Sequence, residues 1–166
     1  MTGIVRMQFA APGITYDLKL ERNITVIKDE GATGKSALCS WLDRWNNVRG
    51  TKEAKGLSYF ATGNMQPHLL TRANLLDRVY ELWTQPSIVF VDEAWHVAET
   101  HEFLAYVSQS SHYFVILSRD LRSLRGITFS VNSIMALTGS RYKTLVPWLS
   151  TPAGKQTNLM QKGNLF

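Results

Sequence analysis

Cysteine is nearly absent from this chain of 166 residues. A single residue of this type, Cys39, cannot form an internal disulfide and has no second thiolate with which to build a cysteine metal site. Because Cys39 falls on an expected helix, we predict a buried thiol rather than a reactive one. Such sparse cysteine usage is typical of a reducing compartment, and we expect a cytoplasmic protein.

Long hydrophobic runs are also missing. The most apolar stretches, residues 87–91 and 113–117, are far shorter than the roughly 20 residues that a membrane-spanning helix needs. Residues 1–9 contain neither an extended hydrophobic region nor a small-residue cleavage site, so the pattern does not indicate secretion. We therefore expect buried strands and no membrane partner.

Basic residues only slightly outnumber acidic ones, and the formal net charge is +5 at pH 7. The densest basic stretch holds Arg119, Arg122 and Arg125, and this modest excess leaves a nucleic-acid or protein partner open. The length and a hydrophobic content of 45% suit a single domain, which we expect over residues 1–150. Residues 151–166 have no apolar period and are predicted to form a mobile tail.

Strand and helix periods alternate along the chain. Strands are expected at residues 4–9, 15–20, 24–28, 57–61, 87–92, 112–117, 133–137 and 142–146. Helices are expected from the residue after Gly34 to about Asn47, over residues 69–83 and over residues 99–109. This order predicts an α/β protein with three layers: a mostly parallel sheet, helices on both of its faces, and an N-terminal β-hairpin.

The strand at residues 24–28 leads into a small-residue loop and then a helix, with Gly34, Lys35 and Ser36 at the junction. A loop of this kind aims several backbone amides at one point, as the phosphates of a nucleotide require. The expected nucleotide-binding segment comprises Glu30, Gly31, Ala32, Thr33, Gly34, Lys35, Ser36 and Ala37. Lys35 would reach the outer phosphates, and the Ser36 hydroxyl would bind Mg²⁺. Asp29 stands where this motif has its first glycine, and its negative charge predicts weaker nucleotide binding.

A second motif follows at residues 88–93, where four apolar residues precede Asp92 and Glu93. A buried strand would deliver the Asp92 carboxylate to its C-terminal end, where it can hold Mg²⁺ together with Ser36. Glu93 would then orient or deprotonate the attacking water.

The two motifs together resemble the Walker A and Walker B segments of the P-loop NTPase superfamily, in its branch with a catalytic glutamate that includes the AAA+ and ABC ATPases. The resemblance implies an additional strand between the two Walker strands, with a polar residue after it that senses the outermost phosphate. Residues 113–119 are similar to that element, which makes Ser118 the sensor candidate and Arg119 its neighbour. The chain has no Leu-Ser-Gly-Gly signature and no helical lid. Its compact core and strand-rich end are similar to phage and mobile-element ATPases of the zonular occludens toxin type.

The leading hypothesis is therefore a Mg²⁺-dependent hydrolase of a nucleoside triphosphate, with ATP as the expected substrate. The expected catalytic residues are Lys35, Glu93, Ser118 and Arg119, and the expected metal ligands are Ser36 and Asp92. A nucleotide or small-molecule kinase and a nucleotide-regulated binding module without turnover remain alternatives, and a homo-oligomer is left open. The four histidines are interpreted as surface or capping residues, although His96 lies only three positions after Glu93.

Overall fold

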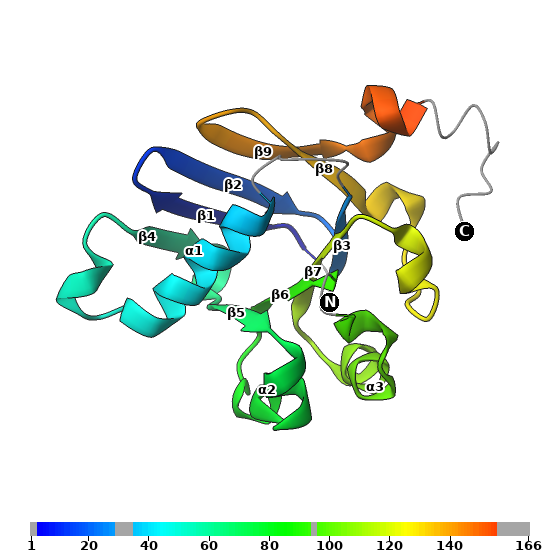
Figure 1. Cartoon of the computed structure of the whole chain (residues 1–166), viewed down its shortest axis with the longest axis horizontal. Coiled ribbons are helices and arrows are strands. Elements are labelled where there is room, and N and C mark those ends of the chain that lie inside the picture. The colour runs from blue at the N-terminus through cyan, green and yellow to red at the C-terminus, as the bar shows by residue number, and fades with distance from the viewer. Residues whose placement is uncertain (1–2, 29–34, 94–95, 156–166) are drawn as a thin grey trace.

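The structure, a computed structural model, describes residues 3–28, 35–93 and 96–155 (Figure 1). Within these residues one sheet of nine strands runs in the order β4-β1-β2-β9-β8-β3-β7-β6-β5. The strands are β1 (Val5–Ala11), β2 (Ile14–Leu20), β3 (Ile24–Lys28), β4 (Ser58–Ala61), β5 (Pro67–Leu70), β6 (Ile88–Asp92), β7 (Tyr113–Ser118), β8 (Ile134–Thr138) and β9 (Tyr142–Pro147). The α-helices are α1 (Lys35–Val48), α2 (Arg72–Leu76) and α3 (His101–Gln109). Short 3-10 turns include Lys52–Ala54, Thr62–Asn64, Val79–Leu82, Val97–Glu99, Leu121–Leu124, Val131–Ser133 and Trp148–Ser150.

The first two strands form the predicted N-terminal hairpin. β1 and β2 pair antiparallel, with Val5 opposite Leu20 at the open end. Alternate residues of β1 point to opposite faces, so Met7 and Phe9 are fully buried while Arg6 is exposed. The hairpin thereby supplies one apolar face to the core, as the alternation in the sequence predicts.

The centre of the sheet is parallel. β3 lies between β7 and β8 and is parallel to both, and β6 lies between β5 and β7 and is parallel to both. β7 thus separates β3 from β6, which is the strand insertion that the resemblance implies. With antiparallel pairs at β1–β2, β1–β4 and β8–β9, the chain is a mixed α/β protein with a mostly parallel, strongly curled sheet.

Helices cover both faces of the parallel part of the sheet. Val26 and Ile27 are neighbours on β3 and point to opposite faces. Ile27 belongs to the same core cluster as Leu42 of α1. Val26 belongs to a second cluster with Phe103 of α3. Burial of successive residues on both sides explains why β3 and β7 read as continuous apolar runs.

The predicted helix over residues 69–83 is wrong. Residues 67–70 form β5, which pairs in parallel with β6, and only residues 72–76 are α-helical. Thr71 caps this short helix in a reciprocal capping box with Asn74. Arg78 then adopts a left-handed backbone conformation with φ of 58°, which stops the helix. Pairing with a distant strand and local capping outweigh the helical spacing of the apolar residues.

The predicted strand over residues 57–61 forms as β4. β4 is an outer strand of the described sheet and pairs with β1. Phe60 is 64% exposed on it. The predicted final strand pair is confirmed as antiparallel β8 and β9, with Gly139 at φ of 101° in the turn. No helix within the described ranges has the length and apolar character of a membrane span.

Candidate functional site

Three parallel strands end at the same edge of the sheet. Lys28 at the end of β3 is the register partner of Ser118 at the end of β7, and Asp92 at the end of β6 is the partner of Leu117. Asp92, Glu93 and Ser118 line a cleft of about 630 Å³ at this edge. The carboxyl ends of parallel strands in α/β sheets are where ligands commonly bind, so the sheet brings the predicted Walker B acids and the predicted sensor residue to a suitable place.

The predicted phosphate loop can be located only by its two ends. β3 ends at Lys28, and α1 begins at Lys35. The binding residues predicted at Glu30, Gly31, Ala32, Thr33 and Gly34 lie outside the described residues, as does Asp29. Lys35 and Ser36 form the start of α1, but their side chains also lie outside the described part. Ala37 follows them in the first turn of α1 and is exposed.

Glu93 is the most unusual group in the cleft. Its side chain is only 6% exposed, and one carboxylate oxygen, Oε2, accepts a hydrogen bond of 3.0 Å from the backbone N–H of Ala98. The other oxygen, Oε1, is buried and has no hydrogen-bond partner among the described residues. Burial raises the pKa of Glu93 to about 7, an effect that the Ala98 hydrogen bond reduces and the Glu99 carboxylate increases.

Ser118 has a hydroxyl that is already engaged. Its Oγ donates to the carbonyl of Asp120 at 3.0 Å and accepts from the Asp120 backbone N–H at 3.2 Å. Ser118 is 1% exposed. These two bonds fix the turn that follows β7, so the hydroxyl holds the loop rather than standing open to a ligand.

Arginines form the basic wall of the cleft. Arg122 is bound to the Asp120 carboxylate through two hydrogen bonds of 3.0 and 3.1 Å, which compensate its charge. Arg119 and Arg125 also line the cleft, and neither forms an ion pair with any described residue. Two guanidinium groups without an ion-pair partner among the described residues therefore line the same cleft as Asp92 and Glu93.

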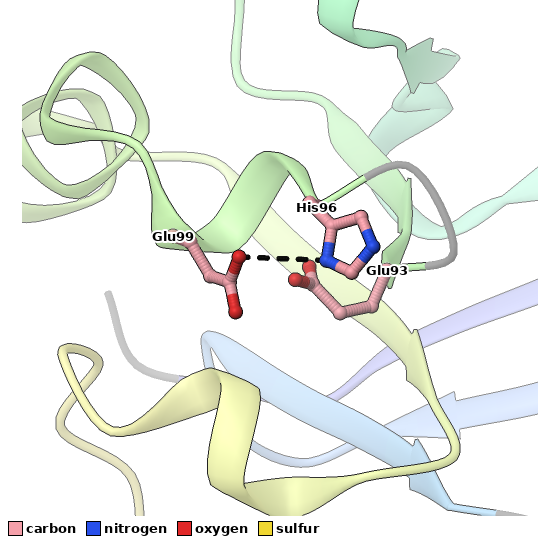
Figure 2. A group of neighbouring side chains, drawn as sticks. All are labelled: Glu93, His96 and Glu99. Atoms are coloured by element: carbon pink, nitrogen blue, oxygen red, sulfur yellow. Dashed lines mark ion pairs between the residues drawn. The ribbon is translucent and has the colours of Figure 1, made fainter.

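Two further side chains lie beside Glu93: His96, whose closeness in the sequence was noted, and Glu99, which the sequence analysis did not single out. His96 and Glu99 line the cleft beside Glu93, and His96 Nδ1 lies 3.4 Å from Glu99 Oε2 (Figure 2). Both side chains are exposed, whereas Glu93 is buried. The signal was present as a carboxylate, an imidazole and a carboxylate at intervals of three residues.

A buried lysine lies close to the same edge. Lys28 is 7% exposed, and its Nζ lies 5.7 Å from the centre of the Trp148 ring. Its positive charge helps to lower the pKa of Asp120 on the rim of the cleft, although the hydrogen bond from Arg122 lowers it more. A cation at the end of β3 adds to the basic side of the site.

Comparison of the chain with protein-family models, with curated proteins and with solved structures gives no match. The function of the cleft must therefore be inferred from its own residues and their arrangement.

Proposed function

We propose that this protein binds a nucleoside triphosphate, with ATP as the expected substrate, together with Mg²⁺, and hydrolyses it. The observation that carries the proposal is the state of Glu93. It is a buried carboxyl with a pKa of about 7, one of its oxygens has no hydrogen-bond partner within the described part of the chain, and it directly follows Asp92 at the end of a parallel strand. A general base works best when its pKa lies near the working pH.

We assign phosphate binding to residues 30–37. The backbone amides of this segment would donate hydrogen bonds to the triphosphate, and Lys35 would contribute a positive charge. Asp92 offers a carboxylate at the cleft, and oxygen ligands of this kind are those that Mg²⁺ prefers. Asp92 and Ser36 would hold the ion, which when bound neutralises charge on the phosphate oxygens.

In the reaction, the oxygen of a water molecule attacks the γ-phosphorus, and the bond from that phosphorus to the bridging oxygen of the β-phosphate breaks. Glu93 takes a proton from the attacking water through Oε1, the oxygen that has no hydrogen-bond partner among the described residues, and later returns it to solvent. Its other oxygen stays bound to the Ala98 N–H, which keeps the carboxyl oriented. The products are the nucleoside diphosphate and inorganic phosphate.

The basic wall supports the same chemistry. Arg119 carries a charge that no described carboxylate compensates, and such a charge can stabilise a phosphoryl group in transfer. Ser118 contributes by positioning the Arg119 loop, because its hydroxyl is bonded to Asp120. We therefore assign Arg119 to phosphate contact and Ser118 to the support of that contact.

The experiment is phosphate release by purified wild type, Glu93→Gln, Asp92→Asn and Lys35→Ala with Mg²⁺ and ATP. Loss of the general base should lower kcat by about 10²-fold or more while nucleotide binding persists. Glu102→Gln on the exposed start of α3 is the matched control and should hydrolyse like wild type. Equal release by wild type and Glu93→Gln would exclude the role assigned to Glu93. Transfer of phosphate to an added nucleoside, with little release to water, would instead indicate a kinase.

A further inference from the structure

Glu93, His96 and Glu99 meet on one side of the cleft (Figure 2). Each offers one ligand atom, and these atoms lie within 4.8 Å of one another. We propose that the three side chains form a binding site for a first-row transition-metal ion of the Zn²⁺ type, distinct from the Mg²⁺ position assigned to Asp92 and Ser36.

The spacing of the two exposed ligands fits a shared metal ion. His96 Nδ1 and Glu99 Oε2 are 3.4 Å apart. That distance is longer than a normal N–H···O hydrogen bond, which is about 2.7–3.2 Å. Two ligand atoms at about 2.1 Å from one tetrahedral zinc ion lie roughly 3.4 Å from each other. The pair therefore has the separation of two neighbouring ligands.

The third ligand carries independent evidence. Glu93 is 6% exposed, yet its Oε1 has no hydrogen-bond partner among the described residues. A buried oxygen without a partner costs free energy unless something binds it. Glu93 lines the same cleft as His96 and Glu99, and its carboxyl lies beside the His96 ring and near the Glu99 carboxylate in Figure 2. A cation between the three side chains would satisfy this oxygen while Oε2 keeps its bond to Ala98. Because the same oxygen is assigned to proton transfer in the proposed hydrolysis, a bound ion would inhibit that reaction.

The ligand set indicates the class of metal. An imidazole nitrogen suits Zn²⁺, Fe²⁺, Cu²⁺ or Ni²⁺, whereas Mg²⁺ and Ca²⁺ prefer sites made of oxygen alone. Three protein ligands leave a further coordination position open towards the cleft, as in zinc sites that bind water or a substrate. The exposure of His96 and Glu99 provides the path by which the ion enters.

The local chain explains why these residues converge. β6 delivers Glu93 just past its end, and the backbone N–H of His96 donates to the Glu93 carbonyl at 2.9 Å. The 3-10 turn Val97–Glu99 then brings Glu99 back to the same side. The three ligands thus come from residues close together in the sequence.

The test is calorimetric titration of Zn²⁺ into the full chain without nucleotide, so that its result does not depend on the proposed hydrolysis. Glu99→Gln and His96→Asn each remove one ligand. Asn tolerates the left-handed backbone at position 96, where φ is 54°. Each variant should weaken Zn²⁺ binding by at least about tenfold. Glu102→Gln and His101→Asn remove the same residue types from the neighbouring exposed start of α3, and both should bind Zn²⁺ like wild type.

A second measurement reports coordination directly. Co²⁺ in the wild-type site should give visible absorption bands that His96→Asn changes in position and intensity. Zn²⁺ binding that is unaltered in both ligand variants, or that millimolar Mg²⁺ abolishes, would overturn the proposal. Loss of Zn²⁺ binding in Glu99→Gln with retained phosphate release would support the metal site and leave the hydrolase proposal intact. Retained Zn²⁺ binding with no hydrolysis by wild type would contradict only the proposed hydrolysis.

Discussion

Lys28 and Ser118 are register partners at the ends of two adjacent parallel strands, β3 and β7. Lys28 is the last residue of β3, and Ser118 is the last residue before the loop that carries Arg119. Because the strands are parallel, the chain enters the predicted phosphate loop at the same edge at which the arginines begin. This relationship places the entry to the predicted Walker A segment at the same sheet edge as the arginines of the cleft.

Arg119 should matter more for nucleotide binding than its exposure alone suggests. Replacing it by alanine removes a charge that has no described ion-pair partner at the cleft, so the affinity for ATP should fall by about tenfold, which corresponds to ~1.4 kcal/mol. Fluorescence titration with a labelled ATP analogue measures this. Arg141→Ala, in the exposed turn between β8 and β9, is the control and should bind normally. Unchanged affinity in Arg119→Ala would remove this arginine from the site.

Truncation of the adjacent residues Leu75 and Leu76 should lower stability by very different amounts. Leu75 is 1% exposed and packs in the core cluster of α3, whereas Leu76 is 63% exposed. Leu75→Ala should lower the free energy of unfolding by about 2–5 kcal/mol, and Leu76→Ala by less than about 0.5 kcal/mol. Urea denaturation of the two variants gives the comparison. The reverse order would favour a continuous helix over residues 69–83, in which Leu76 lies on the apolar face.

Asp17 should be an important polar group of the hairpin. Its carboxylate accepts hydrogen bonds from Arg6 at 2.9 and 2.6 Å, from Gln8 at 3.3 Å and from the hydroxyl of Tyr142. These bonds join β1, β2 and β9 across the sheet. Asp17→Asn should lower the free energy of unfolding by about 1–2 kcal/mol, since Arg6 itself is exposed and solvent screens part of the attraction.

Thermal unfolding of Asp17→Asn beside Glu21→Gln gives the matched test. Glu21 forms only an exposed ion pair with Lys19, so its removal should change stability by less than about 0.5 kcal/mol. An equal, small effect of both substitutions would show that the Asp17 network contributes nothing beyond a surface ion pair.

His68 should make stability depend on pH in the mildly acidic range. Its ring stacks on Trp83 at 4.3 Å, and burial lowers its pKa from 6.5 to about 4, with smaller contributions from Arg49 and His112. The unfolded chain therefore binds a proton more readily than the folded chain. Stability is fully present above pH 6.5 and is lost as the pH falls towards 4, by at most about 1.4 kcal/mol per pH unit for this group.

Urea midpoints measured from pH 7.5 down to pH 4 in wild type, His68→Gln and His101→Gln check this dependence. His68→Gln should show a shallower slope, while His101→Gln, which is exposed, should follow wild type. Burial also lowers the pKa of His112, whereas the raised pKa of Glu93 changes stability in the opposite direction over this range, so the difference between wild type and His68→Gln reports the His68 contribution. An identical pH profile in all three proteins would contradict the assignment to His68.

Much of the local structure was predictable because it depends on residues close together in the chain. The apolar run at residues 88–92 becomes a buried strand followed by Asp92 and Glu93 at its end, as its composition indicates. The change of period after Gly34 correctly predicts a helix, which ends at Val48. The helix predicted over residues 69–83 is wrong because its first residues depend on a distant segment. Leu69 and Leu70 pair with β6 instead of forming helical hydrogen bonds with their neighbours in the chain.

The sequence by itself determined the strand and helix periods, the two Walker-like segments and the carboxylate pair, because those features follow from short-range spacing. Only the tertiary structure decided that β7 lies between β3 and β6, that Arg119 and Asp92 line one cleft, and that His96 and Glu99 join Glu93. These relationships depend on strand order and on the path of loops, which are set by packing between distant segments. The raised pKa of Glu93 is also decided by the tertiary structure, because burial causes it and burial exists only in the folded chain.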